Sequence, residues 1–294
     1  MKKQIECHPE FQSKYILKNK LANQDYGKQH IYVCQNITDG HEYVAKLIQK
    51  NTTASSHEIG ILEKIANEAQ DAPFLILIER LTSISSEYDI IITEKYSMDL
   101  MDYMMQKGRL HESEAIMIFK KLCNAVKILH TWNILHNDIK PENVFLKLGH
   151  DSAVEVHLGD FGSICSIGKL IDTDVGVTLR YVPPEFHRGV FRQEKVYYKP
   201  SHDIFSLGII LFCMLTNEFP FSDLDGSQRF KELHDLIFTD KITMKYKYLS
   251  RESISFLRKL LHLDADQRFS SVDQILEHSW IRADTKTLKK RNFH

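Results

Sequence analysis

Two short segments of the chain carry polar side chains in an order that phosphoryl transfer requires. Residues 136–143 contain Asp138, Lys140 and Asn143, and a second segment begins at Asp160. A carboxylate such as Asp138 can accept the proton of an attacking hydroxyl, and a lysine can neutralise a moving phosphoryl group. Asn143 and Asp160 offer the hard oxygen atoms that Mg²⁺ prefers as ligands. The two segments together predict a magnesium-dependent phosphoryl transfer.

Further segments match patterns that the eukaryotic protein kinase family places at fixed positions. Lys46 ends a Tyr-Val-Ala-Lys sequence in a β-prone stretch, and Glu58 lies among apolar residues with helical spacing. Residues 178–185 resemble the substrate-docking turn and the Ala-Pro-Glu ending of the family, with Pro183 in place of alanine, and residues 264–268 resemble its late Asp-Pro-x-x-Arg motif. The chain therefore resembles a eukaryotic-type serine/threonine protein kinase over nearly its whole length.

This resemblance implies an α+β, bilobal protein kinase fold. The smaller N-lobe is expected to be β-rich with one regulatory helix, and the larger C-lobe is expected to be helical. The expected parts are an N-terminal extension (1–14), a kinase domain (15–281) with an N-lobe (about 15–94), a hinge (about 95–98) and a C-lobe (about 99–281), and a basic tail (282–294).

Hydrophobic patterns predict the elements that position these residues. Predicted strands are at 29–33, 42–48, 74–77 and 89–93. A helix is expected from Ser55 to Ile65, and a buried apolar helix from Asp203 through Leu215. The core face of another helix is marked by Ala115, Phe119, Leu122, Val126 and Leu129.

The resemblance also implies roles for the matching residues. Lys46 anchors the inner phosphates of ATP and pairs with Glu58, and Asp138 and Lys140 complete the catalytic set. Implied ATP contacts are Lys46, Gly27, Ile31, Val44, Thr93, Glu94, Tyr96 and Phe145. Implied ligands of Mg²⁺, with Mn²⁺ as the alternative, are Asn143 and Asp160, and implied substrate contacts are Thr178, Glu142 and Asp99. Implied structural residues are His136 packed beneath Phe161, Gly162, Asp203, and Glu185 in a buried ion pair with Arg268.

One departure from the family pattern concerns the phosphates of ATP. Kinases usually cover them with a Gly-x-Gly-x-x-Gly loop, whose missing side chains allow close approach of the backbone. Here residues 23–31 take that place, with Gln24, Tyr26 and Gln29 at the three glycine positions and Gly27 displaced. We expect weaker ATP binding or slower turnover, and not loss of the chemistry.

Two further departures concern the adenine site and control of activity. Val44 stands where the family usually has alanine, and with Phe145 it is expected to narrow the adenine pocket. Asn137 stands where many kinases have an arginine that commonly clasps a phosphate on the activation segment, and asparagine cannot make that bidentate, charged contact. Asp174 supplies a permanent negative charge where many relatives carry the phosphorylated residue. We therefore expect activity without phosphorylation of this segment.

Two functions from different classes remain open. An active kinase is favoured by the complete set of catalytic and metal residues, whereas a pseudokinase, a binding module without catalysis, is supported only by the degenerate loop. Lys140, two residues after Asp138, and Thr178 indicate serine or threonine as the acceptor, because tyrosine kinases usually carry an arginine pattern in that loop. Glu142 and Asp99 match positions that receive an arginine upstream of the acceptor, so basic protein substrates are expected.

The expected helix at Ser55–Ile65 carries a weak point. Gly60 lies inside it and lowers helix stability by about 1 kcal/mol relative to alanine. Apolar burial against a second copy of the chain, or against another activator, would hold the helix and its glutamate in place. A homodimer is the simpler expectation.

Composition agrees with a globular intracellular protein. The 294 residues are 43% hydrophobic with a formal net charge of −1, so large cores are permitted and neither a membrane nor direct nucleic-acid contact is expected. Five widely spaced cysteines indicate neither a disulfide framework nor a zinc site. No stretch has the pattern of a signal peptide or a transmembrane helix, which favours the cytoplasm or nucleus.

The compact chain and its degraded glycine loop also resemble the baculovirus and granulovirus serine/threonine kinases. That narrower resemblance implies work in an infected insect cell and a small arginine-rich DNA-packaging protein as one substrate.

Overall fold

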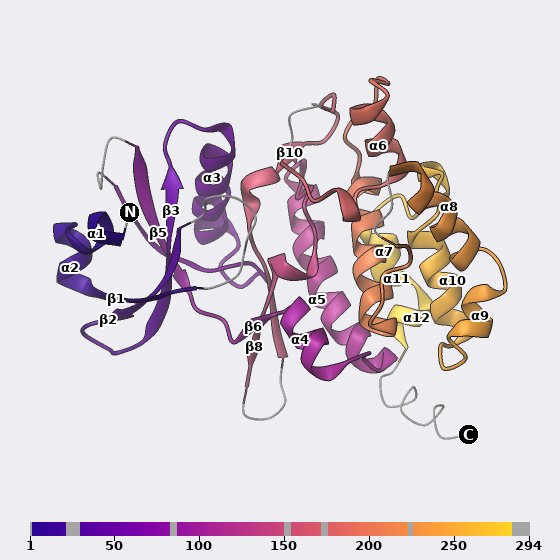
Figure 1. The fold of residues 1–294 in the computed structure, drawn as a ribbon, viewed down its shortest axis with the longest axis horizontal. Coiled ribbons are helices and arrows are strands. Elements are labelled where there is room, and N and C mark those ends of the chain that lie inside the picture. Colours follow the sequence, from indigo (N-terminus) through magenta and orange to yellow (C-terminus); the bar gives the residue numbers. More distant parts are fainter. Residues whose placement is uncertain are drawn as a thin grey trace. The chain divides into compact units, whose positions relative to one another are not determined.

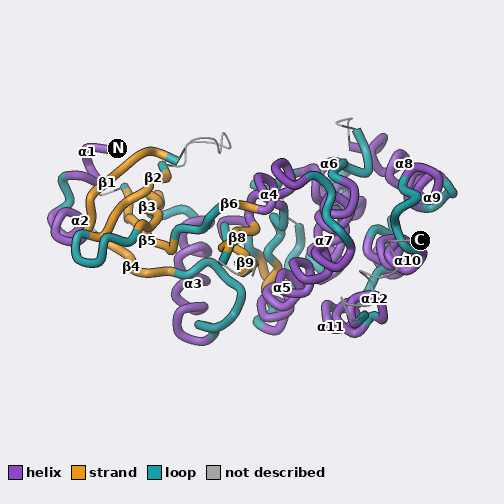
Figure 2. Tube along the Cα trace, turned by 90° about the horizontal axis from the view of Figure 1, so that it is seen from below, coloured by secondary structure: helices purple, strands orange, loops and turns teal. Residues whose placement is uncertain are grey.

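The computed structural model describes residues 2–21, 30–82, 87–149, 154–171, 176–222 and 226–283. The chain forms two compact units, an N-terminal unit that ends at Ser97 and a C-terminal unit that begins at Met98 (Figure 1). Strands dominate the first unit and helices dominate the second, as the orange and purple segments of Figure 2 show. The α+β fold with a small β-rich lobe and a larger helical lobe is confirmed.

The N-terminal unit is built on one antiparallel sheet with the strand order β1-β2-β3-β5-β4. Its strands are β1 (Tyr15–Lys20), β2 (Ile31–Asn36), β3 (Glu42–Gln49), β4 (Leu77–Leu81) and β5 (Tyr88–Glu94). The sequence does not predict β1, because this edge strand buries little besides Tyr15. The strand predicted at 74–77 is wrong in position: Phe74 is fully buried before the strand, and alternating burial begins only at Leu77.

Helices cover both faces of this sheet. On β3, Lys46 points toward α3 (Thr53–Glu68), while Ala45 and Leu47 on the opposite face join the core that Ile5 and Phe11 enter. These two residues come from α1 (Lys2–Glu6) and α2 (Pro9–Lys14), which lie across the sheet from α3 (Figure 1). Residues 2–14 therefore pack into the core of the N-terminal unit.

Helix α3 is longer than the sequence predicts. It spans 16 residues, from Thr53 to Glu68, in place of the expected Ser55–Ile65. The hydroxyl of Thr52 accepts a hydrogen bond from the Ser55 amide at 3.1 Å and caps the first turn. The helix therefore starts on a cap that the apolar pattern alone does not reveal.

The C-terminal unit is centred on α5 (Glu112–Thr131) and α7 (Pro200–Thr216). The predicted core face of α5 is confirmed, since all five of its marker residues are fully buried. Helix α7 is buried from Ser201 to Thr216, and it begins at Pro200, three residues before the predicted start. None of the helices in the described part of the chain is both long and apolar enough to cross a membrane.

Shorter elements complete the C-terminal unit. Its other helices are α4 (Leu100–Lys107), α6 (Pro184–Phe191), α8 (Gly226–Ile237), α9 (Lys241–Lys245), α10 (Arg251–Leu260), α11 (Val272–Glu277) and α12 (Ser279–Arg282). Its strands are β6 (Met98–Asp99), β7 (Ile134–Leu135), β8 (Val144–Leu148), β9 (Val154–Leu158) and β10 (Cys165–Ser166), paired as β6-β8-β9 and β10-β7. Residues 136–143 thus connect β7 to β8, and Asp160 follows β9.

Helices α7 and α10 approach each other closely at Gly208. A Cβ atom on this residue would lie 2.8 Å from Cδ2 of Leu261 and 2.9 Å from Cβ of Leu260. Real side chains do not tolerate such distances, so any larger residue would push the two helices apart. The central helix that supports the candidate site therefore depends on a glycine here.

Candidate active site

The centre of the candidate site is the carboxylate of Asp138, which is 7% exposed. Its Oδ1 accepts a hydrogen bond from the backbone amide of Thr178 at 2.8 Å, and its Oδ2 accepts one from Nζ of Lys140 at 2.7 Å. The side-chain amide of Asn143 donates to the same Oδ2 at 3.3 Å. Both carboxylate oxygens are therefore held in place by groups from the loop after β7 and from the turn at residue 178.

Lys140 joins this carboxylate to Thr178, which is predicted to contact the substrate. Its Nζ also donates to Oγ1 of Thr178 at 2.7 Å, so one ammonium group contacts both side chains. The lysine itself is 8% exposed. The sequence assigns these three residues separate roles, and it gives no sign of the contacts between Asp138 and Thr178, which lie 40 positions apart.

Asn143 and Asp160 are the candidate metal ligands. The amide nitrogen of Asn143 donates to the carbonyl of Asp138 at 2.8 Å, and these bonds leave its amide oxygen for a cation. The carbonyl of Asn143 accepts from the Gly159 amide at 3.0 Å, so the chain segment that leads into Asp160 is tied to it. Asp160 itself adopts the left-handed region at φ +60°.

The donor set suits Mg²⁺ bound with a nucleotide. Among the described residues, no group of three or more His, Cys, Asp and Glu side chains could hold a metal ion on its own. Mg²⁺ typically takes one or two protein oxygens and fills its other positions with phosphate oxygens and water. One carboxylate from Asp160 and one amide oxygen from Asn143 fit that requirement.

Asp203, at the start of α7, fixes the backbone of the catalytic loop. It accepts hydrogen bonds from the amides of His136 at 3.0 Å and Asn137 at 2.9 Å, and it contacts Nε2 of His130 at 2.9 Å. Burial alone would raise the pKa of Asp203, but these bonds and the nearby histidines lower it. The sequence does not predict the part that His130 plays, because α5 and α7 meet only in the folded chain.

The predicted packing partners of the loop also lie together. The rings of His136 and Phe161 are 5.5 Å apart, and Nε2 of His136 is 3.0 Å from the carbonyl of Gly159. Asn137 adopts φ +66°, a conformation that asparagine tolerates better than most residues. Its side-chain amide donates to the carbonyl of Ser163 at 3.3 Å. At this position the side chain therefore makes a neutral contact with the backbone.

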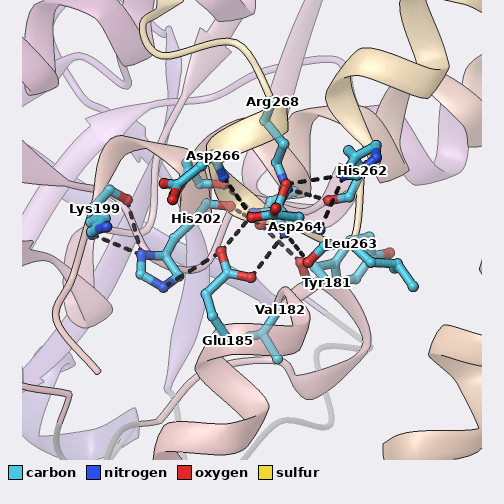
Figure 3. A network of polar contacts seen from close by, with 12 residues as sticks. Tyr181, Val182, Glu185, Lys199, His202, His262, Leu263, Asp264, Asp266 and Arg268 are labelled. Atoms are coloured by element: carbon cyan, nitrogen blue, oxygen red, sulfur yellow. Dashed lines mark hydrogen bonds and ion pairs between the residues drawn. The ribbon is translucent and has the colours of Figure 1, made fainter. Parts of the chain in front are cut away.

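A buried ion pair anchors α6, and Figure 3 shows it within a wider polar network. Nη1 and Nη2 of Arg268 lie 2.6 and 2.9 Å from the two carboxylate oxygens of Glu185. The same guanidinium donates to the carbonyls of Ser201 at 3.0 Å and His262 at 2.6 Å. His202 is also buried here, and burial lowers its pKa. This arrangement fixes the end of the segment that carries Thr178.

In the N-terminal unit, Lys46 of β3 pairs with Glu58 of α3. Their Nζ and Oε1 atoms are 2.6 Å apart, and the side chains are 12% and 7% exposed. The other glutamate of this helix, Glu63, is exposed and pairs with Arg80 at 3.2 Å. The structure thus brings Lys46 together with the glutamate that the family pattern indicates.

The remaining predicted ATP residues are distributed over both units. Within the N-terminal unit, Val44 lies opposite Thr93 in the sheet, Ile31 lies opposite Lys46, and Glu94 ends β5. The hydroxyl of Tyr96 accepts a hydrogen bond from the Ile76 amide at 3.3 Å. In the C-terminal unit, Phe145 of β8 lies opposite Asp99. Gly27, the rest of 22–29 and Asp174 lie outside the described residues.

Asp99 and Glu142 form an acidic pair in the C-terminal unit. Asp99 caps α4 by accepting from the Asp102 amide at 2.8 Å. Burial, with the nearby carboxylates of Asp102 and Glu142, raises the pKa of Asp99 to about 6. Burial also raises the pKa of Glu142, and its Oε2 atom has no hydrogen-bond partner among the described residues. The cations Lys140 and Arg180 lie near enough to Glu142 to offset part of this rise in its pKa.

Comparison with known proteins identifies the family of the chain. A family model described as the protein kinase domain matches residues 15–281. The carbon catabolite-derepressing protein kinases of Candida glabrata and Saccharomyces cerevisiae are each 28% identical over 273 residues, which is 92% of this chain but 42% and 40% of theirs. The protein of the same name from Candida tropicalis is 28% identical over 274 residues, 41% of its length. The chain thus spans about two fifths of the length of these relatives.

Proposed function

Because the chain belongs to the protein kinase family, we propose that it is an active enzyme that transfers the γ-phosphate of ATP to serine or threonine residues of proteins. The observation that carries this proposal is the contact of Asp138 with Lys140 and with the turn at Thr178. The carboxylate that serves as the acid-base group thus contacts both a cation and the docking turn, which is the arrangement that phosphoryl transfer to a hydroxyl needs.

The mechanism assigns each residue one task. Asp138 orients the acceptor hydroxyl and takes its proton, and Lys140 offsets the negative charge that develops beside it. Lys46, held by Glu58, binds the inner phosphates of the nucleotide. Mg²⁺, held by Asn143 and Asp160, would neutralise charge on the phosphates when bound.

The alternative of a pseudokinase is not favoured. It depends on the degenerate glycine loop, of which residues 23–29 lie outside the described part of the chain. The described acid-base, lysine and metal-ligating groups support an enzyme. The experiment that tests this is transfer of labelled phosphate from ATP to a serine peptide and to its tyrosine counterpart, with label expected in the serine peptide alone.

We also propose that the substrates are basic. Asp99 and Glu142 lie close enough together for the charge of Glu142 to raise the pKa of Asp99, and this pair of carboxylates suits an arginine upstream of the acceptor. A small arginine-rich DNA-packaging protein, as the resemblance to baculovirus and granulovirus kinases implies, is a substrate of this class.

The pKa of Asp99 makes this preference dependent on pH. Above pH of about 6 the carboxylate is charged and attracts arginine, and as the pH falls through about 6 it becomes neutral and that attraction is lost. We expect kcat/KM for a peptide with upstream arginine, relative to an alanine peptide, to rise about ten-fold between about pH 5 and about pH 7. Steady-state kinetics with the two peptides across this range measure the ratio.

The control for this prediction is Asp99→Asn. Asparagine keeps the cap of α4 but carries no charge at any pH, so the ratio for this variant should stay nearly flat. The preference for basic substrates would be contradicted by a wild-type ratio near one at every pH. If Asp99→Asn kept the full pH dependence, a group other than Asp99 would be responsible for it.

We further propose that activity does not need activation-segment phosphorylation and that a partner contacts α3. Asn137 supports activity without phosphorylation, because its side chain contacts a backbone carbonyl and offers no charge for a phosphate.

A cavity beside α3 supports the proposed partner. Its volume is about 530 Å³, and it is lined in part by Ile59, Gly60 and Arg80. A second copy of the chain is the simplest such partner. Phosphatase-treated protein, assayed at several concentrations, tests both parts.

A further inference from the structure

A buried arginine from α8 holds the turn that follows Thr178. This turn is the 3-10 helix Leu179–Tyr181. Nη1 of Arg229 donates to the carbonyl of Leu179, and Nη2 donates to the carbonyl of Val182 at 3.4 Å. Arg229 is 6% exposed and therefore joins the first residue of the turn to the residue just after it.

The charged guanidinium of Arg229 is buried among neutral groups, which costs desolvation free energy. Its two hydrogen-bond acceptors are neutral carbonyls, and its guanidinium lies 4.6 Å from the centre of the Phe230 ring. Burial lowers its pKa to about 10. An alkyl side chain could fill the same space without desolvating a charge, so what this arginine adds here is its hydrogen bonds to the two carbonyls.

The position of this turn affects the catalytic carboxylate directly. Thr178, which precedes the turn, donates its amide hydrogen to Asp138 and contacts Lys140 through its hydroxyl. From the other side, the hydroxyl of Ser206 in α7 donates to the carbonyl of Tyr181 at 3.0 Å. The carbonyls at 179, 181 and 182 are thus all held by side chains of α7 and α8.

We propose that Arg229 is a positioning residue for phosphoryl transfer, which fixes the turn after Thr178 and thereby the place of the acceptor peptide beside Asp138. This inference rests on the proposed kinase function and adds to it a residue of α8 outside every family motif in the sequence. Arg229 acts through the backbone of residues 179–182.

The experiment compares Arg229→Met with a matched control, Arg258→Met. Arg258 of α10 makes the same kind of contact, from Nε to the carbonyl of Ile237 at 2.8 Å and from Nη2 to that of Thr239 at 3.2 Å, and both of these acceptors lie outside the turn. Losing hydrogen bonds from a charged group should lower kcat/KM for the peptide about ten-fold or more in Arg229→Met. The KM for ATP should stay within about two-fold.

Hydrogen exchange gives a readout that needs no activity. The Thr178 amide, which donates to Asp138, should exchange faster in Arg229→Met and in Arg229→Lys than in wild type, and should be unchanged in Arg258→Met. Arg229→Lys keeps the charge and can reach one carbonyl, so its kcat/KM should lie between those of wild type and Arg229→Met.

The outcomes separate this inference from the proposed function. Unchanged exchange at residue 178 in both Arg229 variants overturns the positioning role, whether or not the protein is an enzyme. The positioning role is also overturned if Arg229→Met and Arg258→Met lose kcat/KM equally for the peptide and for ATP, and if these losses follow the loss of thermal stability. A wild-type protein without phosphate transfer, but with faster exchange in the Arg229 variants, would defeat the proposed function and leave the role of Arg229 in fixing the turn intact.

Discussion

Asp138→Asn is expected to lower kcat for peptide phosphorylation by about 10²–10⁴-fold, because asparagine cannot accept the proton of the acceptor hydroxyl. The variant should fold, since the asparagine oxygen can still accept the Thr178 amide that now bonds Asp138 at 2.8 Å. The pair of measurements is kcat for a serine peptide and the thermal unfolding midpoint.

A second acidic residue provides the control for this substitution. Asp273 on α11 forms an exposed ion pair with Lys127 at 2.5 Å, so Asp273→Asn makes the same chemical change at the surface. Exposed pairs contribute about 0–1 kcal/mol, and this variant should keep the wild-type kcat. If Asp138→Asn had the same kcat as Asp273→Asn, Asp138 would not be the proton acceptor.

Arg268→Met is expected to lower the free energy of unfolding by about 3–5 kcal/mol, because it leaves the carboxylate of Glu185 buried without its cation. The wild-type pair is bidentate at 2.6 and 2.9 Å, and the arginine side chain is fully buried. Denaturant titration followed by circular dichroism measures the loss. The segment from Thr178 to α6 should loosen with it.

Arg188→Met is the matched arginine control. Arg188 pairs with Glu194 at 3.4 Å, and both side chains are more than two fifths exposed. Its removal should cost about 0–1 kcal/mol. If Arg268→Met proved no less stable than Arg188→Met, the buried pair would not be what anchors the end of this segment.

The sequence predicts most of the candidate site because the chemistry imposes residue types in a fixed order. Asp138, Lys140 and Asn143 lie within one short loop, so their proximity follows from chain connectivity. The core face of α5 follows from apolar spacing, which the structure confirms at all five marked positions.

What the sequence does not predict depends on contacts between distant segments. The bond from the Thr178 amide to Asp138 and the one from Arg229 to Leu179 join residues 40 and 50 positions apart. No periodicity encodes such pairs, since the first arises when residue 178 packs against the loop after β7 and the second when α8 packs against the turn. The edge strand β1 escapes prediction for a different reason, because most of its side chains are exposed and show no apolar alternation.

Residues 2–14 illustrate the same limit at the start of the chain. The sequence sets them apart as an extension, since two helices of five and six residues are too short to show a repeating apolar face. In the structure Ile5 and Phe11 are 0% and 1% exposed in the sheet core. The burial of isolated apolar residues in a short segment cannot be inferred from the segment itself, because it depends on the surface that they cover.

The central claim is tested most directly by phosphate transfer from labelled ATP to a serine peptide, using phosphatase-treated protein with and without Mg²⁺. Wild-type protein should label the peptide only with Mg²⁺ present. Lys46→Met, which removes the ammonium 2.6 Å from Glu58, should label it at least about 10²-fold more slowly. Absence of labelling by folded wild-type protein, or equal labelling by Lys46→Met, would contradict the assignment of this chain as an active protein kinase.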